Sequence, residues 1–346
     1  MLKFRASALM GCLSLIGLMS TSAFAGDAEL AGNTEGASIM QVKVTRGQID
    51  AINNVVYAQI KQTRSSRPMS MSLLVPRNDS KKPAILYFPG GGFTSAEQDK
   101  FIQMRMALAE AGFVVAAVEY RVIPDTFPAP LVDAKAAVRY LRQHASEYGI
   151  DPTRIGVLGD SAGGWLAQMV AMTAGEKTFD KGDFLDQSSD VQAAATIYGI
   201  SNLLNIGEGF PESVKKVHQS PAVTEALLVN GAAFRDFAGA PIDSDKEKAL
   251  FASPLGHING KKPPFLIMHG SADTLVSPEQ SAQLYRALKK EGNQADYILL
   301  KGAEHGDAQW YQQPVIDKVV SWFASSLGKP SVKPTGQQST NPDDNT

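Results

Sequence analysis

The stretch that decides the fold is Ile155-Gly156-Val157-Leu158-Gly159-Asp160-Ser161-Ala162-Gly163-Gly164. The apolar run at 155–158 predicts a buried strand, and the alanine-rich run at 162–173 predicts a helix. A serine within G-x-S-x-G, on the sharp turn between a strand and a helix, is typical of a nucleophile whose hydroxyl is exposed at the edge of a sheet. The flanking glycines are required because a Cβ there would collide with the neighbouring strand and helix. Ser161 is therefore the predicted nucleophile.

The same rhythm of strands and helices extends outward from this turn. Continuous apolar runs are typical of buried parallel strands, and the segments between them have helical spacing. The predicted strands cover residues 54–59, 69–75, 84–88, 113–118, 155–158, 191–198, 264–269 and 296–300. The predicted helices cover residues 98–111, 131–148, 162–173, 278–291 and 316–327. This alternation predicts an α/β protein with a mostly parallel central sheet and helices on both faces.

The alternation of strands and helices is interrupted between residues 201 and 262, where Gly, Pro and short helical segments dominate. Because this segment lies between two predicted strands of the main sheet, we interpret it as a small cap-like insertion rather than a domain of its own. It mixes Leu and Phe with many charged residues, so it does not have the composition of a strongly apolar lid.

The two ends of the chain have compositions of their own. A short basic start and an apolar run at 6–19 precede Ala23-Phe24-Ala25, which fits the A-x-A site of signal peptidase. The apolar run is shorter than the roughly 20 residues that span a bilayer, although an uncleaved anchor is an alternative. We expect a signal peptide over 1–25, a periplasmic or secreted protein without stable membrane insertion, a catalytic domain over 26–328 and a disordered tail over 329–346.

Charge and cysteine content narrow the class of protein. The formal net charge is −2 with both signs interspersed, so the sequence gives no sign of a nucleic-acid surface. Cys12 is the only cysteine and lies within the predicted signal segment, which leaves the mature chain without disulfides. The sequence contains no H-E-x-x-H pattern, cysteine cluster or phosphate-binding glycine loop, and we expect neither a metal nor an organic cofactor.

A serine hydroxyl requires a base within hydrogen-bond reach, and after G-x-S-x-G the acid and then the histidine follow in chain order. His305 follows the predicted strand 296–300 in a loop with glycines on both sides. Asp273 follows the predicted strand 264–269. Its carboxylate would fix the imidazole tautomer and stabilise the imidazolium, although capping of the next helix is an alternative role. His305 is the predicted base and Asp273 the predicted acid.

The remaining histidines fit other roles. His269 ends a predicted strand, and we interpret it as part of a structural turn. His144 lies on a predicted helix and is expected at the surface. His218 and His257 lie in the insertion and are interpreted as exposed loop residues, although contact with the substrate is an alternative. Asp160 does not follow the strand expected to deliver the acid and is a poorer candidate than Asp273.

A glycine run follows the predicted strand 84–88. Pro89-Gly90-Gly91-Gly92-Phe93 stands where this arrangement of strands places its first oxyanion donors. Glycines allow backbone N–H groups to approach a tetrahedral oxyanion closely, and the amide of Ala162 joins them. Loss of one such donor costs on the order of 10²–10³ in turnover.

Taken together, these motifs resemble those of the α/β-hydrolase esterases, in particular the BD-FAE (carbohydrate-esterase-like) and hormone-sensitive-lipase-like branches. The resemblance spans about residues 54–327 and rests on Phe88-Pro89-Gly90-Gly91-Gly92-Phe93, Glu119-Tyr120-Arg121, Phe127-Pro128-Ala129-Pro130, Asp133-Ala134, the motif 159–164, His269-Gly270-Ser271-Ala272-Asp273 and Glu304-His305-Gly306. It implies an α/β-hydrolase fold and a triad of Ser161, Asp273 and His305. It also implies that the groups around the oxyanion are Gly91, Gly92 and Ala162.

One residue departs from the pattern of these branches. Pro89 occupies the position of the histidine that usually precedes the glycine run. In the family that histidine orders the glycine loop and does not transfer protons, so the resemblance still implies the same reaction.

The expected function is that of a serine carboxylesterase acting on short-chain acyl or carbohydrate-linked esters through an acyl-enzyme. Acetyl or hydroxycinnamoyl groups on plant polysaccharide fragments are the substrates that the resemblance suggests for an exported enzyme. Two alternatives stay open: an amidase or peptidase that uses the same triad, and a hydrolase-fold protein that only binds. The binding reading predicts that a member of the triad is missing.

Overall fold

The computed structural model describes residues 35–329. The predicted signal peptide and the tail from residue 330 onward lie outside the described residues, so both stay predictions. Residues 35–43 contain a turn but no helix or strand. All elements named below belong to the compact unit that begins at Val44.

Eight strands form one sheet in the order β1-β2-β4-β3-β5-β6-β7-β8. Their bounds are β1 Ile49–Lys61, β2 Ser66–Pro76, β3 Lys82–Phe88, β4 Val114–Val118, β5 Ile150–Asp160, β6 Ala193–Ile197, β7 Phe265–Gly270 and β8 Ala295–Leu300. β1 pairs with β2, and β2 with β4, in antiparallel fashion, whereas every pairing from β4 to β8 is parallel. The predicted mostly parallel sheet is confirmed.

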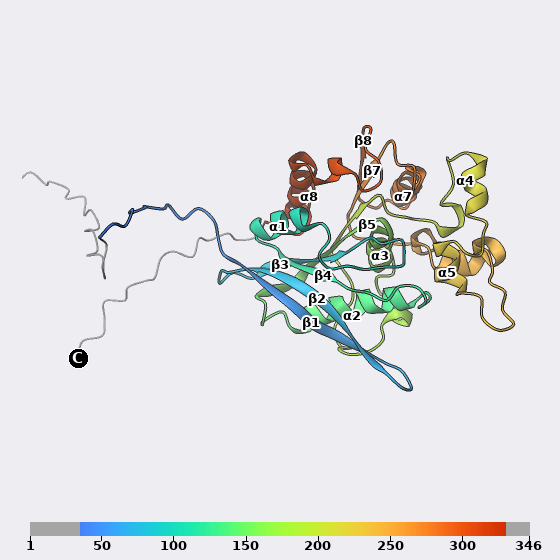
Figure 1. Cartoon of the computed structure of the whole chain (residues 1–346), viewed down its shortest axis with the longest axis horizontal. Coiled ribbons are helices and arrows are strands. Elements are labelled where there is room, and N and C mark those ends of the chain that lie inside the picture. Colours follow the sequence, from blue (N-terminus) through green and yellow to red (C-terminus); the bar gives the residue numbers. More distant parts are fainter. Residues whose placement is uncertain (1–34, 330–346) are drawn as a thin grey trace, which may run out of the picture. The chain divides into compact units, whose positions relative to one another are not determined.

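Helices cover both faces of this sheet (Figure 1). The five longer ones are α1 Ile102–Glu110, α2 Ala129–Gln143, α3 Ser161–Met172, α7 Glu279–Lys290 and α8 Gln313–Ser326. Along β3, Ala84, Leu86 and Phe88 pack in the core that α2, α3 and α7 share. The alternate residues Ile85 and Tyr87 pack in the core formed with α1 and α8. Both faces of the strand are therefore apolar, which is why β3 reads as a continuous hydrophobic run.

The segment 201–262 lies between β6 and β7 and contains three short α-helices. These are α4 Glu212–Val217, α5 Thr224–Asn230 and α6 Lys246–Phe251. The indole N–H of Trp165 in α3 donates to Ala252 O over 2.9 Å, and Gln280 Oε1 in α7 accepts from the amide of Ser201 over 3.0 Å. The insertion is thus tied to two helices of the main body.

Two sequence-based expectations need correction. His257 is buried, with 8% of its surface exposed, because its two ring nitrogens lie 2.9 Å from Glu176 Oε1 and 2.8 Å from Phe251 O. The prediction of an exposed loop histidine was wrong at this position. Helix α1 begins at Ile102 rather than at residue 98. The residues before it form turns that fold back on the glycine run.

The parallel strands bring distant segments to one edge of the sheet. The glycine run follows β3, Ser161 follows β5, Asp273 comes after β7 and His305 after β8. Because these four strands run in the same direction, all four segments leave the sheet at its carboxyl edge. None of the helices described here combines the length and apolar content that crossing a bilayer requires.

Candidate active site

Ser161 occupies a strained turn between β5 and α3. Its φ is 52°, in the left-handed region that non-glycine residues rarely adopt. A Cβ on Gly159 would lie 2.0 Å from Gly163 O, and one on Gly163 would lie 2.0 Å from Phe88 O. Both positions therefore require glycine, as the sequence predicted. The turn leaves Ser161 partly exposed at the carboxyl edge of the sheet.

The three side chains predicted to form the triad lie in one line of contacts. His305 Nε2 is 2.9 Å from Ser161 Oγ, and His305 Nδ1 is 2.8 Å from Asp273 Oδ2. The residues are separated by 144 and 32 positions in the chain. The His305 side chain is 14% exposed and that of Asp273 is fully buried, so solvent reaches the base but not the acid.

The carboxylate of Asp273 has a partner on each oxygen. Oδ1 accepts from the amides of Leu275 and Val276, both over 2.9 Å, while Oδ2 faces His305. Burial by itself would raise the pKa of Asp273, but hydrogen bonds from His269, His305 and Val276 outweigh it and hold the pKa well below its usual range. The side chain thus supports the local turn through Oδ1 and contacts the imidazole through Oδ2.

His269 is buried beneath Asp273. Its Nε2 is 2.9 Å from Val276 O and 3.3 Å from Asp273 Oδ2, and its Nδ1 is 2.7 Å from Ser281 Oγ. A carbonyl oxygen can only accept, so Nε2 carries a proton and donates to Val276 O. The sequence indicated a structural turn here, and the structure adds that His269 also stabilises the negative charge of Asp273.

The imidazole of His305 is fixed by its surroundings. The ring of Tyr198 lies beneath it with a centroid separation of 4.4 Å, and Trp310 packs on the same tyrosine. The indole N–H of Trp310 donates to Glu304 O over 2.8 Å, and Asp307 Oδ2 accepts from the amide of Glu304 over 3.0 Å. These contacts hold the loop after β8 in place. No periodic pattern in the sequence indicates a role at the site for Tyr198 or Trp310.

The predicted oxyanion donors belong to the segments that follow β3 and β5. Ala162 is the second residue of α3, and its amide is among the four N–H groups that a helix leaves without an internal partner. Within residues 35–329, the amides of Gly91 and Gly92 donate to no protein acceptor. Gly92 has a φ of 58°, and a Cβ there would meet nothing within 4 Å. The glycine run therefore has two backbone donors without a protein acceptor, and the space beside Gly92 is open.

Side chains from three segments contact the glycine run, in which Pro89 replaces the usual histidine. Tyr120, 1% exposed, donates its hydroxyl to Pro89 O over 2.5 Å. The amide of Gly90 donates to Asp160 Oδ1 over 2.9 Å, and Lys100 Nζ donates to Gly90 O over the same distance. The peptide groups before and after Gly90 are thus fixed by side chains from three different segments.

Asp160, predicted to be a poorer candidate for the acid than Asp273, contacts the glycine run. Its Oδ1 accepts from the hydroxyl of Tyr87 over 2.7 Å as well as from Gly90. Burial raises the pKa of Asp160, and the two hydrogen bonds offset only part of that effect. Asp160 directly precedes the nucleophile Ser161, and its side chain thereby connects this turn to the glycine run. The position of Asp160 within the G-x-S-x-G motif is the one sequence feature that could have indicated these contacts.

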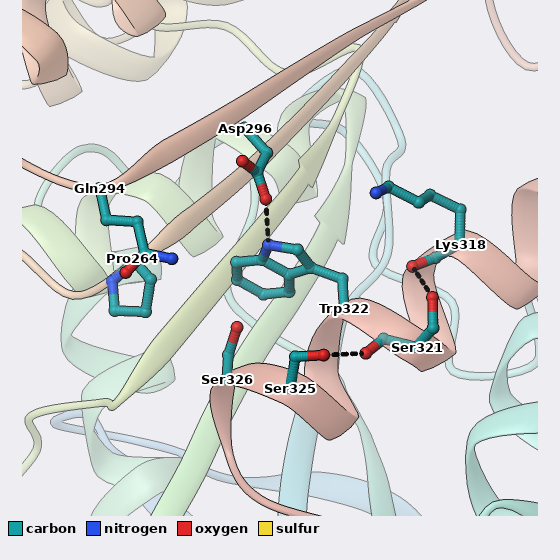
Figure 2. Close-up of a pocket in the computed structure, with 8 residues that line it drawn as sticks. All are labelled: Pro264, Gln294, Asp296, Lys318, Ser321, Trp322, Ser325 and Ser326. Atoms are coloured by element: carbon teal, nitrogen blue, oxygen red, sulfur yellow. Dashed lines mark hydrogen bonds between the residues drawn. The ribbon is translucent and has the colours of Figure 1, made fainter.

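A cavity lies at the opposite edge of the sheet from Ser161. It has a volume of about 360 Å³ and lies between α8 and the amino ends of β7 and β8. Figure 2 shows the residues that line it, among them Trp322, whose Nε1 donates to Asp296 Oδ2. The cavity is separate from the line of contacts at Ser161. Among the described residues, no group of three or more His, Cys, Asp or Glu side chains is arranged to hold a metal ion.

The arrangement at the carboxyl edge combines a serine hydroxyl, an imidazole in contact with it and a set of free backbone donors. Such a set can accept the hydroxyl proton and stabilise a tetrahedral oxyanion.

Comparison with known proteins finds esterases among the relatives of this chain. The probable carboxylic ester hydrolase LipM of Mycobacterium tuberculosis is 29% identical over 61% of this chain and 46% of its own. The chain spans about half the length of the curated relatives of this kind that it matches.

Two solved structures share the α/β-hydrolase fold. A carbohydrate esterase from gut microbiota has a TM-score of 0.69 and 24% identity, over 80% of this chain and 96% of that one. An acetyl ester-xyloside bifunctional hydrolase from Caldicellulosiruptor lactoaceticus has a TM-score of 0.64 and 25% identity, over 82% and 97%. The BD-FAE family model matches residues 71–288, which is more than half of the chain. This protein belongs to the BD-FAE family of α/β-hydrolases.

Proposed function

We propose that this chain is a serine carboxylesterase that removes short acyl groups from alcohols, carbohydrate hydroxyls among them. One observation carries the proposal: a line of hydrogen bonds joins Ser161 Oγ to His305 and His305 to Asp273, beside free backbone donors. Membership of the BD-FAE family and the esterase names of its relatives support it.

In the proposed first step, Ser161 Oγ attacks the ester carbonyl carbon while His305 Nε2 takes the hydroxyl proton. The carbonyl π electrons move to oxygen, and the oxyanion accepts hydrogen bonds from the amides of Gly91, Gly92 and Ala162. When the intermediate collapses, the C–O bond to the alcohol breaks and His305 gives its proton to the leaving oxygen. The product is an acyl-serine and a free alcohol.

The second step repeats the chemistry with water. His305 deprotonates a water molecule that attacks the acyl-serine, the oxyanion uses the same three amides, and Ser161 regains its proton as the acid departs. Asp273 stays ionised throughout and stabilises the imidazolium formed in each half-reaction. Its depressed pKa suits this role, because a carboxylate that resists protonation keeps its charge next to His305.

The substrate class follows from two further observations. The insertion at 201–262 has charged residues interspersed among its Leu and Phe, which favours small or hydrated substrates over long acyl chains. The Caldicellulosiruptor protein of the same fold carries acetyl ester and xyloside hydrolysis in its name. We therefore favour acetylated or similarly acylated carbohydrates.

Hydrolysis of p-nitrophenyl esters of increasing acyl length tests this proposal. Acetate and butyrate esters are expected to turn over fastest, and Ser161→Ala is expected to lower kcat by at least about 10⁴-fold because it removes the nucleophile. Ser325→Ala, at the opposite edge of the sheet, is the matched control and should retain wild-type rates. A folded wild type that is inert on every ester, or a Ser161→Ala variant that stays active, contradicts the proposal; amide substrates would then be tried first.

The ionisation of Asp273 predicts a pH dependence of stability. Its folded-state pKa lies below its unfolded value, so its contribution is fully present above the unfolded value of about 4 and is lost as pH falls through the folded value. The free energy of unfolding in urea should therefore fall more steeply between pH 5 and about pH 2 in the wild type than in Asp273→Asn. If the free energy of unfolding changes with pH in the same way in both proteins, the ionisation of Asp273 does not contribute to stability and the prediction is contradicted.

Export is also part of the proposal, since carbohydrate esters on polymers lie outside the cell. The A-x-A pattern at Ala23 and Ala25 supports cleavage after Ala25. Expression of the full chain in a bacterium should give a periplasmic or secreted protein whose intact mass corresponds to a start at Gly26. The double variant Ala23→Asp/Ala25→Asp should accumulate with its leader attached. Full-length wild-type protein confined to the cytoplasm would contradict export.

A further inference from the structure

We infer that Lys100 is a positioning residue of the oxyanion site, which orients and polarises the peptide group whose N–H, that of Gly91, faces the oxyanion. The inference rests on the proposed function and deepens it. It concerns a lysine outside the family motifs described above and explains how this chain retains a working glycine loop with Pro89 in place of histidine.

The geometry places the ammonium group on one particular peptide unit. Lys100 Nζ donates to Gly90 O over 2.9 Å, and that carbonyl belongs to the same peptide plane as the free N–H of Gly91. The next plane is held in an analogous way, since Gly91 O accepts from the amide and the hydroxyl of Thr94, both over 2.9 Å. In each of these two peptide planes, the carbonyl oxygen accepts a hydrogen bond while the N–H, that of Gly91 or Gly92, has no protein acceptor.

A hydrogen bond to a peptide oxygen draws electron density from its nitrogen, which makes the N–H at the other end a stronger donor. The effect is larger with a charged donor, because charge-assisted hydrogen bonds are about twice as strong as neutral ones. The same contact restricts rotation about a glycine backbone that would otherwise sample many conformations. Lys100 therefore both aims the Gly91 amide and strengthens it.

The other contacts of Lys100 favour this role over a structural salt bridge. Within residues 35–329, its ammonium lies within 4 Å of no carboxylate. Its side chain is partly buried beside the loop, where Phe101 packs edge-on against Tyr311 with a centroid separation of 5.1 Å. The cation is thus held close to the glycine run without a salt bridge, and its charge also acts on the buried carboxylate of Asp160.

Steady-state kinetics with p-nitrophenyl acetate test the inference through Lys100→Met, which keeps a long apolar stem but loses the charge. We expect kcat to fall by about 10-fold with KM within twofold, a smaller loss than that of an oxyanion donor itself. Lys100→Arg should keep most of the activity. Lys318→Met, which removes a lysine from the cavity at the opposite edge of the sheet, is the matched control and should behave as the wild type.

Two measurements separate polarisation from a merely structural role. An alkyl trifluoromethyl ketone, which forms a tetrahedral oxyanion with the serine, should bind Lys100→Met more weakly by the same factor as kcat falls. Propylammonium, which supplies the missing atoms, should restore activity to Lys100→Ala, whereas 1-propanol should not. The melting temperature of each variant shows whether the fold is kept.

The outcomes are distinguishable from failure of the esterase proposal itself. An inactive wild type contradicts the proposed function. An active wild type with unchanged kcat in Lys100→Met overturns the role of Lys100 alone. So does a loss of kcat that leaves trifluoromethyl ketone affinity unchanged, or one that accompanies a lower melting temperature and is restored by neither arginine nor propylammonium.

Discussion

The close approach of backbone atoms around Ser161 is the constraint on which the rest of the site depends. Gly159 and Gly163 are packed so tightly against Gly163 O and Phe88 O that no side chain fits at either position. This packing draws α3 onto β3 and β5 and forces Ser161 into a left-handed conformation. The energy stored in such a turn, of order 1–3 kcal/mol, is tolerated because the surrounding core is buried on both faces of the sheet.

The acid and the base of the proposed triad are placed around this turn by the loops that follow two other strands. The loop after β7 delivers Asp273 and the loop after β8 delivers His305, each with its own local hydrogen bonds. Asp160 connects the nucleophile turn to the glycine run through the amide of Gly90. The glycine run and the nucleophile turn are therefore connected by hydrogen bonds, which is the kind of preorganisation that the proposed oxyanion site requires.

The sequence predicted the parallel sheet, both helical layers and the residues that meet at Ser161, because these depend on local patterns: apolar runs, glycine spacing and chain order. It missed contacts that depend on tertiary packing. His257 looked like an exposed loop residue and is buried through Glu176, which is 81 residues away. Lys100 and Tyr198 had no motif around them, and only the fold brings the first to Gly90 and the second beneath His305.

The central claim, that Ser161 is the nucleophile and is activated by His305, is tested most directly by covalent labelling. A p-nitrophenyl alkylphosphonate should release one equivalent of nitrophenol, and mass spectrometry of a protease digest should place a single phosphonyl group on Ser161. In His305→Ala the labelling rate should fall by at least about 10²-fold, since the hydroxyl has lost its base. Labelling of another residue, or equal rates in the two proteins, would contradict the account.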